Sequence, residues 1–271
     1  MLMQTIESYE TLAPLLSRQL RKGVRTNAFS DPDEYRREIA AGRLAVQEWD
    51  GGLLLLHRRT GFQRLNFYLY GLELPDLKLQ EPTVLEIAHR PQDEAMQQAV
   101  ALWRDRGFQV LFERVRMQRP RDLTPPVAMA SDVRLARLED QSVLETLMDG
   151  YYDKVLGCLP ERDELAADIR AGAVLCAEGG DGQIIGMLHL ALGRTSTEMR
   201  HFVVENECRR QGIAQRLFDS YQAHTQGKRS LVWVLADNRP AVTMYEKNGF
   251  HTDGWTSTVL YYDVKGCAEH G

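Results

Sequence analysis

The segment 209–214, with the sequence RRQGIA, joins an apolar strand pattern at 198–205 to an amphipathic helix pattern at 213–225. It constrains the fold strongly, because a loop entering a helix presents backbone N–H groups that have no intrahelical partners. The helix dipole adds positive potential at the same place. Gly212 lets the backbone approach an anion closely, and Ala214 is small enough to do the same. The segment therefore predicts a phosphate-binding turn within an α/β fold.

The rest of the second half alternates short strands with helices. We expect, in order, a strand at 133–137, helices at 139–155 and 162–170, a hairpin of strands at 174–178 and 184–192, the strand and helix that flank the turn, a strand at 231–236, a helix at 240–247 and last strands near 254–264. This order predicts a mixed α/β sheet (α+β, with parallel and antiparallel strands) covered by helices on both faces.

A proline-rich stretch divides the chain. Pro120, Pro125 and Pro126 block both helix and central strand, so residues 119–131 are expected to be a linker between domains at 1–118 and 132–266. A repeat supports two related halves: residues 33–42 match residues 163–172 in spacing, at an offset of 130. In both copies a helix ends at Gly and an apolar strand follows. Chance similarity between two common helix–Gly–strand units is the alternative.

Composition excludes several classes of protein. Residues 1–126 hold 18 basic and 17 acidic side chains and residues 127–271 hold 15 and 21, which argues against a nucleic-acid partner. The acidic half suits a cationic amine, although the same charge serves solubility. No apolar run is long enough for a membrane helix and no signal peptide is visible, so we expect a cytoplasmic protein with no membrane partner. The four cysteines show no metal-ligand spacing, so free thiols and no metal are expected.

A second signature follows the turn at the expected distance. Residues 238–250, NRPAVTMYEKNGF, place an Asn after a strand, a Tyr on the next helix and a closing Gly-Phe. Together with 209–214, this stretch resembles the acetyl-CoA-binding motifs of the GNAT superfamily of N-acyltransferases. The resemblance covers about 135 residues in the family's element order. It implies a GNAT-like fold, and the repeat predicts two tandem copies of it.

The resemblance implies a set of acetyl-CoA contacts. In this family two neighbouring strands, the fourth and fifth, splay apart and leave room for the pantetheine arm. The backbone of one strand would bind that arm, the turn would hold the pyrophosphate, and an Asn at the end of the other strand would bind the arm again. The residues concerned are Phe202, Val203, Val204, Arg209, Arg210, Gln211, Gly212, Ile213, Ala214, Gln215 and Asn238.

Two side chains are expected to move protons. Tyr245 lies where the family often places a general acid, and a phenol of ordinary pKa about 10 can protonate a departing thiolate. Glu198 lies where some relatives carry a general base. His201, Glu205 and a chain of water molecules are alternatives, since the strand at 231–235 has no carboxylate. Direct attack by the amine is favoured over a covalent enzyme intermediate.

The first half resembles the same fold without its phosphate turn, because residues 88–92 join a strand to a helix without Gly and include Pro91. We expect this half not to bind acyl-CoA; an unrelated accessory domain is the alternative. The predicted activity is acetyl transfer from acetyl-CoA to a primary amine of a small molecule or peptide, by a monomer or homodimer. Tyr151, Tyr152 and Trp255 would suit the acceptor. A catalytically silent acyl-CoA sensor or scaffold is the competing hypothesis.

Overall fold

The structure is a computed structural model that describes residues 3–122 and 128–264, and it divides into two compact units. Unit 1 comprises residues 3–114 together with 254–264, and unit 2 comprises residues 115–122 and 128–253. The expected linker at 119–131 lies partly outside the described residues, since 123–127 are not among them. The division of roles between 1–118 and 132–266 stays a prediction.

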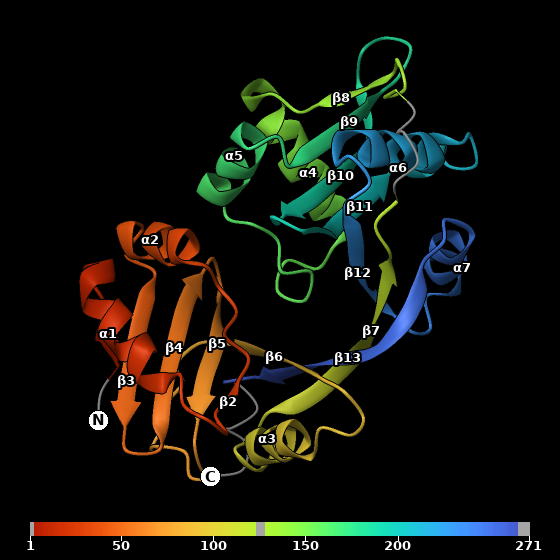
Figure 1. Cartoon of the computed structure of the whole chain (residues 1–271). Helices are drawn as coiled ribbons and strands as arrows, with labels where there is room; N and C mark the ends of the chain where they lie inside the picture. The colour runs from red at the N-terminus through yellow and green to blue at the C-terminus, as the bar shows by residue number, and fades with distance from the viewer. Residues whose placement is uncertain (1–2, 123–127, 265–271) are drawn as a thin grey trace. The chain divides into compact units, whose positions relative to one another are not determined.

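Unit 1 is a sheet with helices on both faces. Its elements are β1 (Gln4–Thr5), α1 (Tyr9–Gln19), β2 (Arg25–Thr26), α2 (Pro32–Ala40), β3 (Leu44–Trp49), β4 (Gly52–Arg59), β5 (Phe62–Leu69), β6 (Thr83–His89), α3 (Glu94–Asp105) and the first part of β7 (Gln109–Arg119). The apolar run at 53–56 is buried on both faces. Leu53 and Leu55 pack in the core under α1 and α2, and Leu54 and Leu56 pack in the core that includes α3. Figure 1 shows α1 and α2 together over these strands.

Unit 2 has the same layered architecture. Its elements are β8 (Val133–Leu135), the 3-10 helix η1 (Leu138–Asp140), α4 (Gln141–Tyr151), α5 (Arg162–Arg170), β9 (Val174–Glu178), β10 (Ile184–Leu192), β11 (Ser196–Val204), the 3-10 helix η2 (Asn206–Cys208), α6 (Ile213–His224), β12 (Arg229–Leu235), α7 (Arg239–Lys247) and the first part of β13 (His251–Tyr262). One core lies under α4 and α5 and the other under α6 and α7. The expected mixed α/β sheet with helices on both faces is confirmed.

The last strand departs from the expected pattern. We expected two strands near the C-terminus, but β13 is one strand from His251 to Tyr262. The Asp253-Gly254 pair that suggests a turn lies inside this strand, where Gly254 takes φ +81°. A glycine with positive φ within a strand bends it locally without ending it.

The two units repeat the same backbone geometry at the predicted offset. Gly42 follows α2 with φ +66° and Gly172 follows α5 with φ +69°. The residues after them bond alike: Arg43 N–H donates to Glu38 C=O and Ala173 N–H donates to Asp168 C=O, each at 2.9 Å. The repeat found in the sequence therefore corresponds to equivalent positions in the two units.

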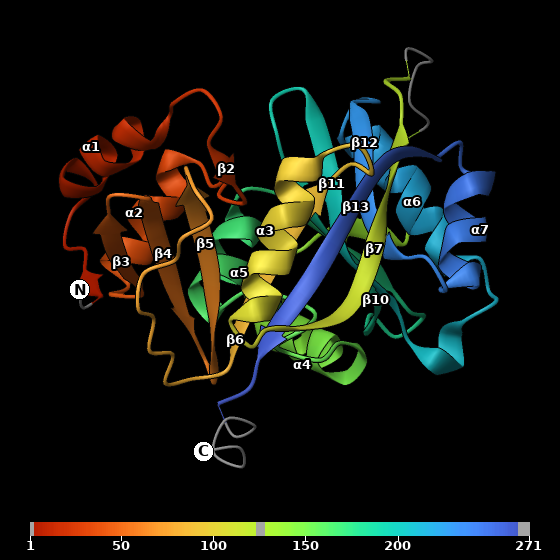
Figure 2. The same cartoon turned by 90° about the horizontal axis from the view of Figure 1, so that it is seen from below.

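Each unit takes one strand from the other half of the sequence. In unit 1, β13 pairs antiparallel with β6 from Thr256↔His89 to Tyr262↔Thr83. In unit 2, β7 neighbours β12. Leu260 of β13 is fully buried in the core of unit 1, which also contains Trp103 of α3. Figure 2 shows α3 running alongside β13.

The place of the missing phosphate turn in unit 1 differs from our expectation. We expected its position to be 88–92, but the helix after that segment, α3, is the counterpart of α7. Both helices end alike, since Phe108 N–H donates to Trp103 C=O and Phe250 N–H donates to Tyr245 C=O. The parallel pair β11–β12 is joined through α6, whereas the parallel pair β5–β6 is joined by residues 70–82 without a helix. Unit 1 thus lacks the whole helix that follows the turn.

Candidate functional site

The 209–215 turn presents a row of unpaired N–H groups. Arg210 has φ +62° and Gly212, at the N-cap of α6, has φ +77°. No backbone N–H from Gln211 to Gln215 has a hydrogen-bond partner among the described residues; the first to be bonded is that of Arg216, to Gly212 C=O. Successive N–H groups with alternating backbone handedness at a helix N-terminus form a concave anion site. The expected order of strand, turn and helix is present, and phosphate binding at the turn stays a prediction.

Arg216 holds the turn in shape, a role that the sequence did not indicate. Its Nη1 donates to Gln211 C=O at 3.0 Å, and its Nε donates to Asp132 at 2.8 Å. With that carbonyl fixed, the Gly212 N–H on the same planar peptide must point the opposite way. Arg209 is also engaged: its Nε donates to Val204 C=O at 3.2 Å and its guanidinium lies 5.4 Å from the ring centre of Tyr151.

The strands on either side of the turn separate where the sequence analysis expected room for a ligand. β11 and β12 pair in parallel from Ser196↔Arg229 to Met199↔Val232, and no pair joins them beyond that point. The strands separate next to an irregularity in the β10–β11 register. His189 is opposite His201 and Leu190 is opposite Met199, so Arg200 is an extra residue in β11. Such a bulge bends its strand and reverses which edge the following groups face. We call the resulting gap beside 202–204 the slot.

Main-chain groups of two predicted residues face the slot. Glu205 N–H donates to Ile185 C=O of β10 at 2.9 Å, so the main chain of Val203 also faces β10. The N–H and C=O groups of Phe202 and Val204 therefore face the other edge, toward β12. Val203 instead contributes a buried side chain to the core under α4 and α5.

Tyr152, which follows α4, occupies the slot-facing groups of Phe202. Phe202 N–H donates to the Tyr152 hydroxyl at 2.9 Å, and that hydroxyl donates to Phe202 C=O at 3.2 Å. A ligand that uses this backbone must therefore displace the Tyr152 hydroxyl. The sequence suggested Tyr152 for the acceptor and gave no sign of this contact, because it joins residues 50 positions apart.

Tyr245 lies on α7 in the core under α6 and α7. It is 6% exposed, and its ring centre lies 5.5 Å from that of Phe250. Burial raises the pKa of Tyr245 above its ordinary value, and repulsion from Tyr152 and Tyr221, if these were ionised, acts in the same direction. The hydroxyl therefore stays protonated at neutral pH, as a proton donor must.

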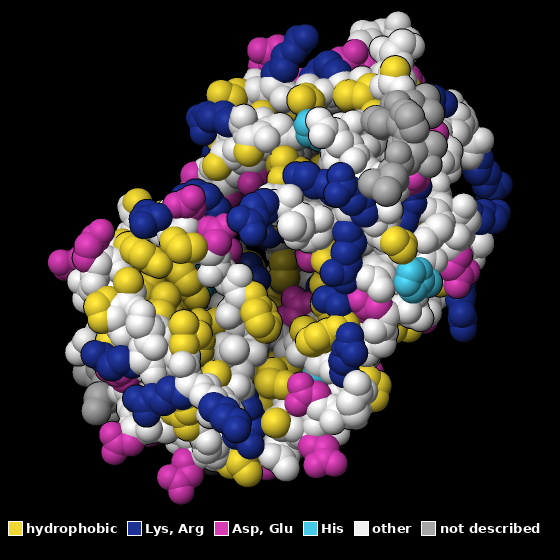
Figure 3. Space-filling view, in the orientation of Figure 1, with side chains coloured by type: hydrophobic (Ala, Val, Ile, Leu, Met, Phe, Trp, Pro, Cys, Tyr) yellow, Lys and Arg dark blue, Asp and Glu magenta, His cyan; other side chains and the backbone are white. Residues whose placement is uncertain are grey.

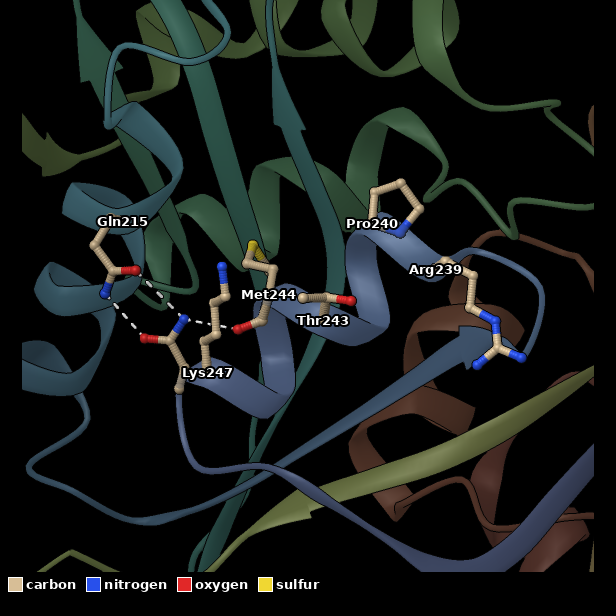
Figure 4. A pocket seen from close by; sticks show the side chains of 7 residues that line it. Gln215, Arg239, Pro240, Thr243, Met244 and Lys247 are labelled. Atoms are coloured by element: carbon tan, nitrogen blue, oxygen red, sulfur yellow. Dashed lines mark hydrogen bonds between the residues drawn. The ribbon is translucent and has the colours of Figure 1, made fainter.

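Gln215 borders a groove between α6 and α7, and Asn238 is the N-cap residue of α7. The Asn238 side chain accepts the Ala241 N–H at 3.3 Å and so caps α7. The Gln215 side chain of α6 donates to Asn248, at the end of α7, at 2.9 Å. Figure 4 shows Gln215 on α6 facing α7, which carries Thr243, Met244 and Lys247. The groove is lined by Gln215, Arg239, Pro240, Thr243, Met244, Lys247 and Asn248. It lies beside the N-terminal turn of α6 and carries two cationic side chains.

Glu198 lies on the other face of the sheet from Tyr245. Its neighbours Thr197 and Met199 point to the α6 side, where Thr197 contacts the Tyr221 hydroxyl at 2.6 Å and Met199 joins the core. Side chains alternate along a strand, so Glu198 points toward the α4 and α5 side. Glu198 is opposite Leu231 in the paired part of β11 and β12, one position before the end of their pairing.

A chain of hydrogen bonds crosses the α4 and α5 side next to the slot. His201 Nδ1 lies 3.0 Å from His189 Nδ1, and His189 Nε2 lies 2.9 Å from Asp168 of α5. His201 Nε2 lies 2.9 Å from Gly157 C=O. Both imidazoles are buried, His189 completely. The sequence suggested His201 as an alternative base but did not indicate its connection to Asp168.

The remaining acceptor candidates have structural partners. Tyr151 donates to Glu205 at 3.0 Å and accepts the Asn206 N–H at 2.7 Å, and burial raises its pKa. Glu205, an alternative base, is thereby tied to α4. Trp255 belongs to unit 1, where the Arg90 guanidinium lies 5.3 Å from its ring centre.

Charges are mixed on the visible surface. Figure 3 shows Lys and Arg side chains beside Asp and Glu side chains on this face of both units. Within the described residues there is no cluster of three His, Cys, Asp or Glu side chains arranged for a metal ion. Nor does that part of the chain contain a helix that is long and apolar enough to cross a membrane.

Comparison with known families agrees with this geometry. A family model described as acetyltransferase (GNAT) domain matches residues 157–259. Residues 157–259 are therefore identified as a GNAT acetyltransferase domain. The domain is of the acyltransferase class, and the match includes the 209–215 turn and Tyr245. No curated protein sequence gives a significant match to the chain.

Solved structures extend the likeness to both units. A tandem GNAT protein from the clavulanic acid biosynthesis pathway matches with a TM-score of 0.61 and 11% identity, over 96% of this chain and 97% of that one. A GCN5-related N-acetyltransferase from Sphaerobacter thermophilus gives 0.57 and 14% over 96% and 94%. A GNAT-family acetyltransferase from Colwellia psychrerythraea gives 0.56 and 17% over 96% and 99%. At these identities the likeness shows the fold, and it confirms the expected GNAT fold class.

Proposed function

We propose that unit 2 transfers an acetyl group from acetyl-CoA to a primary amine of a small molecule or peptide by direct attack. The observation that carries the proposal is the row of unpaired N–H groups from Gln211 to Gln215 beside the open end of the slot. The row suits a pyrophosphate, because fixed N–H groups and a helix dipole both favour negative charge. The slot suits an extended amide-containing arm, because Phe202 and Val204 present strand edges to it.

The groove between α6 and α7 extends this binding surface. Arg239 and Lys247 would add positive charge near the phosphates, and the Gln215 side chain would border them. Asn238, whose side-chain oxygen caps α7, keeps its amide N–H groups for the arm of the co-substrate. Arg209 and Arg210 lie at the start of the turn and would neutralise further charge.

The transfer requires two proton movements. An amine must lose a proton before it attacks the thioester carbonyl; a C–N bond then forms, the C–S bond breaks, and a thiolate leaves. Tyr245 would protonate that thiolate and regain a proton from the attacking nitrogen. Its raised pKa keeps the proton in place until the thiolate develops.

Turnover with purified full-length protein tests the proposal. Thiol release from acetyl-CoA across a panel of primary amines should exceed hydrolysis for at least one class of amine, and Tyr245→Phe should lower kcat by about 100-fold. The Kd for CoA should not change in that variant. Loss of CoA binding itself would mean that Tyr245 is structural.

The silent acyl-CoA sensor remains the alternative, supported by the absence of a carboxylate from β12 (Arg229–Leu235). It predicts tight CoA binding with no amine-dependent thiol release from the whole panel. Such a result would contradict the proposed transferase activity and leave the binding assignment in place.

A further inference from the structure

The buried histidine pair lies between two acceptors. His201 Nε2 faces Gly157 C=O, and His189 Nε2 faces a carboxylate oxygen of Asp168. A carbonyl can only accept, and an ionised carboxylate likewise, so both Nε2 atoms must carry hydrogen. The two Nδ1 atoms, 3.0 Å apart, need one more hydrogen between them. Hydrogen bonds at all three contacts require three hydrogens on the two rings, one more than two neutral imidazoles carry.

The extra proton depends on what faces His201 Nε2. If a donor replaced Gly157 C=O, His201 Nε2 would carry a lone pair in place of a hydrogen. The contacts from His201 to His189 and from His189 to Asp168 would still be hydrogen bonds. His201 Nδ1–H would donate to His189 Nδ1, and His189 Nε2–H would donate to Asp168. In that state the pair holds two hydrogens and can accept a proton at His201 Nε2. A protonated amine is such a donor.

Building on the proposed transferase function, we propose that Asp168, His189 and His201 form the relay that takes the proton from the acceptor ammonium. His201 is the catalytic base, and His189 and Asp168 are positioning residues that act through it. The relay leads outward, since the Asp168 side chain is 26% exposed whereas the His189 side chain is fully buried. His201 thus takes the role of general base for which Glu198, on a paired part of β11, was the first candidate.

The proton balance closes without a further reactant, because the pair first loses its third hydrogen to water through Asp168 as Gly157 C=O withdraws. The ammonium gives one proton to His201 Nε2, and the proton on His201 Nδ1 moves to His189 Nδ1. His189 then carries both hydrogens and pairs with ionised Asp168, while the amine is neutral and attacks the thioester carbon. After the attack, the nitrogen loses a second proton to Tyr245, which has given its own proton to the thiolate. Asp168 finally releases the relay's extra proton to water.

One loop connects co-substrate binding to the base. Residues 152–161, the α4–α5 loop, carry both the Tyr152 hydroxyl on Phe202 and the Gly157 carbonyl on His201. The Tyr152 ring lies edge-on to His201, with centres 5.1 Å apart. A pantetheine arm that displaces Tyr152 therefore acts on the loop that holds Gly157 against the base. This predicts that co-substrate binding frees His201 Nε2 for the amine.

Other titratable groups border the pair from each neighbouring element. Cys176 of β9 lies in the same core, and burial raises its pKa to about 12, so it stays neutral. The loop contributes Tyr152, and β11 contributes Glu198 on the same face. Asp168 is a carboxylate in direct contact with the pair.

Unit 1 carries a related pair that cannot act as a relay. His57 is opposite Leu44 as His189 is opposite Val174, and His57 bonds Glu38 of α2 at 3.2 Å. In the position of His201, however, stands Arg64, opposite His57. An arginine keeps its proton, so it cannot serve as a base. The acid–histidine pair belongs to the fold of both units, and His201 is what makes it a relay in unit 2.

The pH dependence of kcat/KM for the best amine of the panel tests the relay. Wild type should rise with pH and reach a plateau well below the ionisation of the amine. His201→Gln has an amide that can still donate to Gly157 C=O. At the pH of the wild-type plateau its kcat/KM should be about 100-fold lower, and it should keep rising with pH, because only amine that is already neutral reacts. Asp168→Asn should move the rise to lower pH, because its carboxylate stabilises the protonated imidazole.

His57→Gln in unit 1 is the matched control and should keep the wild-type profile and CoA affinity. A His201→Gln profile with the shape of wild type would overturn the relay alone. Wild-type protein that binds CoA without any transfer would overturn the proposed function, and the relay with it. Nitrogen NMR of the wild-type histidines needs no variant: one hydrogen should be shared between Nδ1 of His189 and Nδ1 of His201. No hydrogen between these two atoms would overturn the relay.

Discussion

At the residue scale, one side chain occupies the main-chain groups of Phe202 that face the slot. The Tyr152 hydroxyl satisfies both main-chain groups of Phe202 that a pantetheine arm would use, at 2.9 and 3.2 Å. Ligand binding must break these bonds before it forms its own. The affinity of unit 2 for CoA therefore reflects a competition between Tyr152 and the ligand for Phe202.

Tyr152→Phe should separate these effects. Without the hydroxyl, the ligand-free protein loses about 1 kcal/mol of stability, since Phe202 N–H and C=O lose their partner. The ligand no longer displaces that partner, so Kd for CoA should fall about fivefold. Calorimetric titration and thermal unfolding measure the two quantities.

Tyr151→Phe is the matched control for this substitution. Its hydroxyl contacts Glu205 and Asn206 and does not reach the slot-facing groups of Phe202. It should lower stability without tightening CoA binding. Equal CoA affinities for wild type and Tyr152→Phe would show that Tyr152 does not compete with the ligand.

The sequence predicted the turn but not the state of the slot, for a physical reason. A phosphate-binding turn is encoded locally, by Gly212 and by the periodicity of the helix after it. The slot depends on the extra residue Arg200 in β11 and on a tyrosine from another element. Neither the bulge at Arg200 nor the Tyr152 contact produces a periodic pattern in the sequence. Both become visible only once the strands are paired in the structure.

At the element scale, the N-terminus of α6 depends on backbone handedness. Gly212 has φ +77°, and a Cβ there would lie 3.3 Å from Arg216 Nη1, the group that holds the Gln211 carbonyl. Gly212→Ala should lower stability by about 1 kcal/mol and raise Kd for CoA by about 10-fold, because the turn must shift. Titration with CoA measures the change.

Gly182→Ala controls for handedness alone. Gly182 has φ +82° in the β9–β10 turn, with nothing within 4 Å of an added Cβ. It should lower stability by a similar amount and leave CoA affinity unchanged. If both variants bind CoA like wild type, the turn does not contact the ligand.

On the scale of the whole molecule, each unit is completed by a strand from the other half of the sequence. The alternation of apolar residues in β13 predicts a strand with a buried face, but it does not say which sheet receives it. Division of the chain at a proline-rich stretch could not reveal this exchange. A consequence is that a residue from the end of the chain stabilises the unit formed mainly by its beginning.

Leu260→Ala tests the exchange. Leu260 is fully buried in the core of unit 1, so the substitution should lower its stability by about 2–4 kcal/mol. Hydrogen exchange should accelerate in β4, β5 and β6 and stay unchanged in β9 and β10. Leu190→Ala, from the core of unit 2, should give the reverse pattern. Acceleration confined to β9 and β10 in Leu260→Ala would refute the exchange.

Hydrogen exchange of the full-length protein with and without saturating acetyl-CoA tests the central claim, that unit 2 holds the co-substrate at its turn and slot. Protection should appear at the amides of 211–215 and at Phe202 and Val204. No change is expected at 70–82 or 88–92 of unit 1. Protection confined to unit 1, or none at the 209–215 turn, would contradict the assignment.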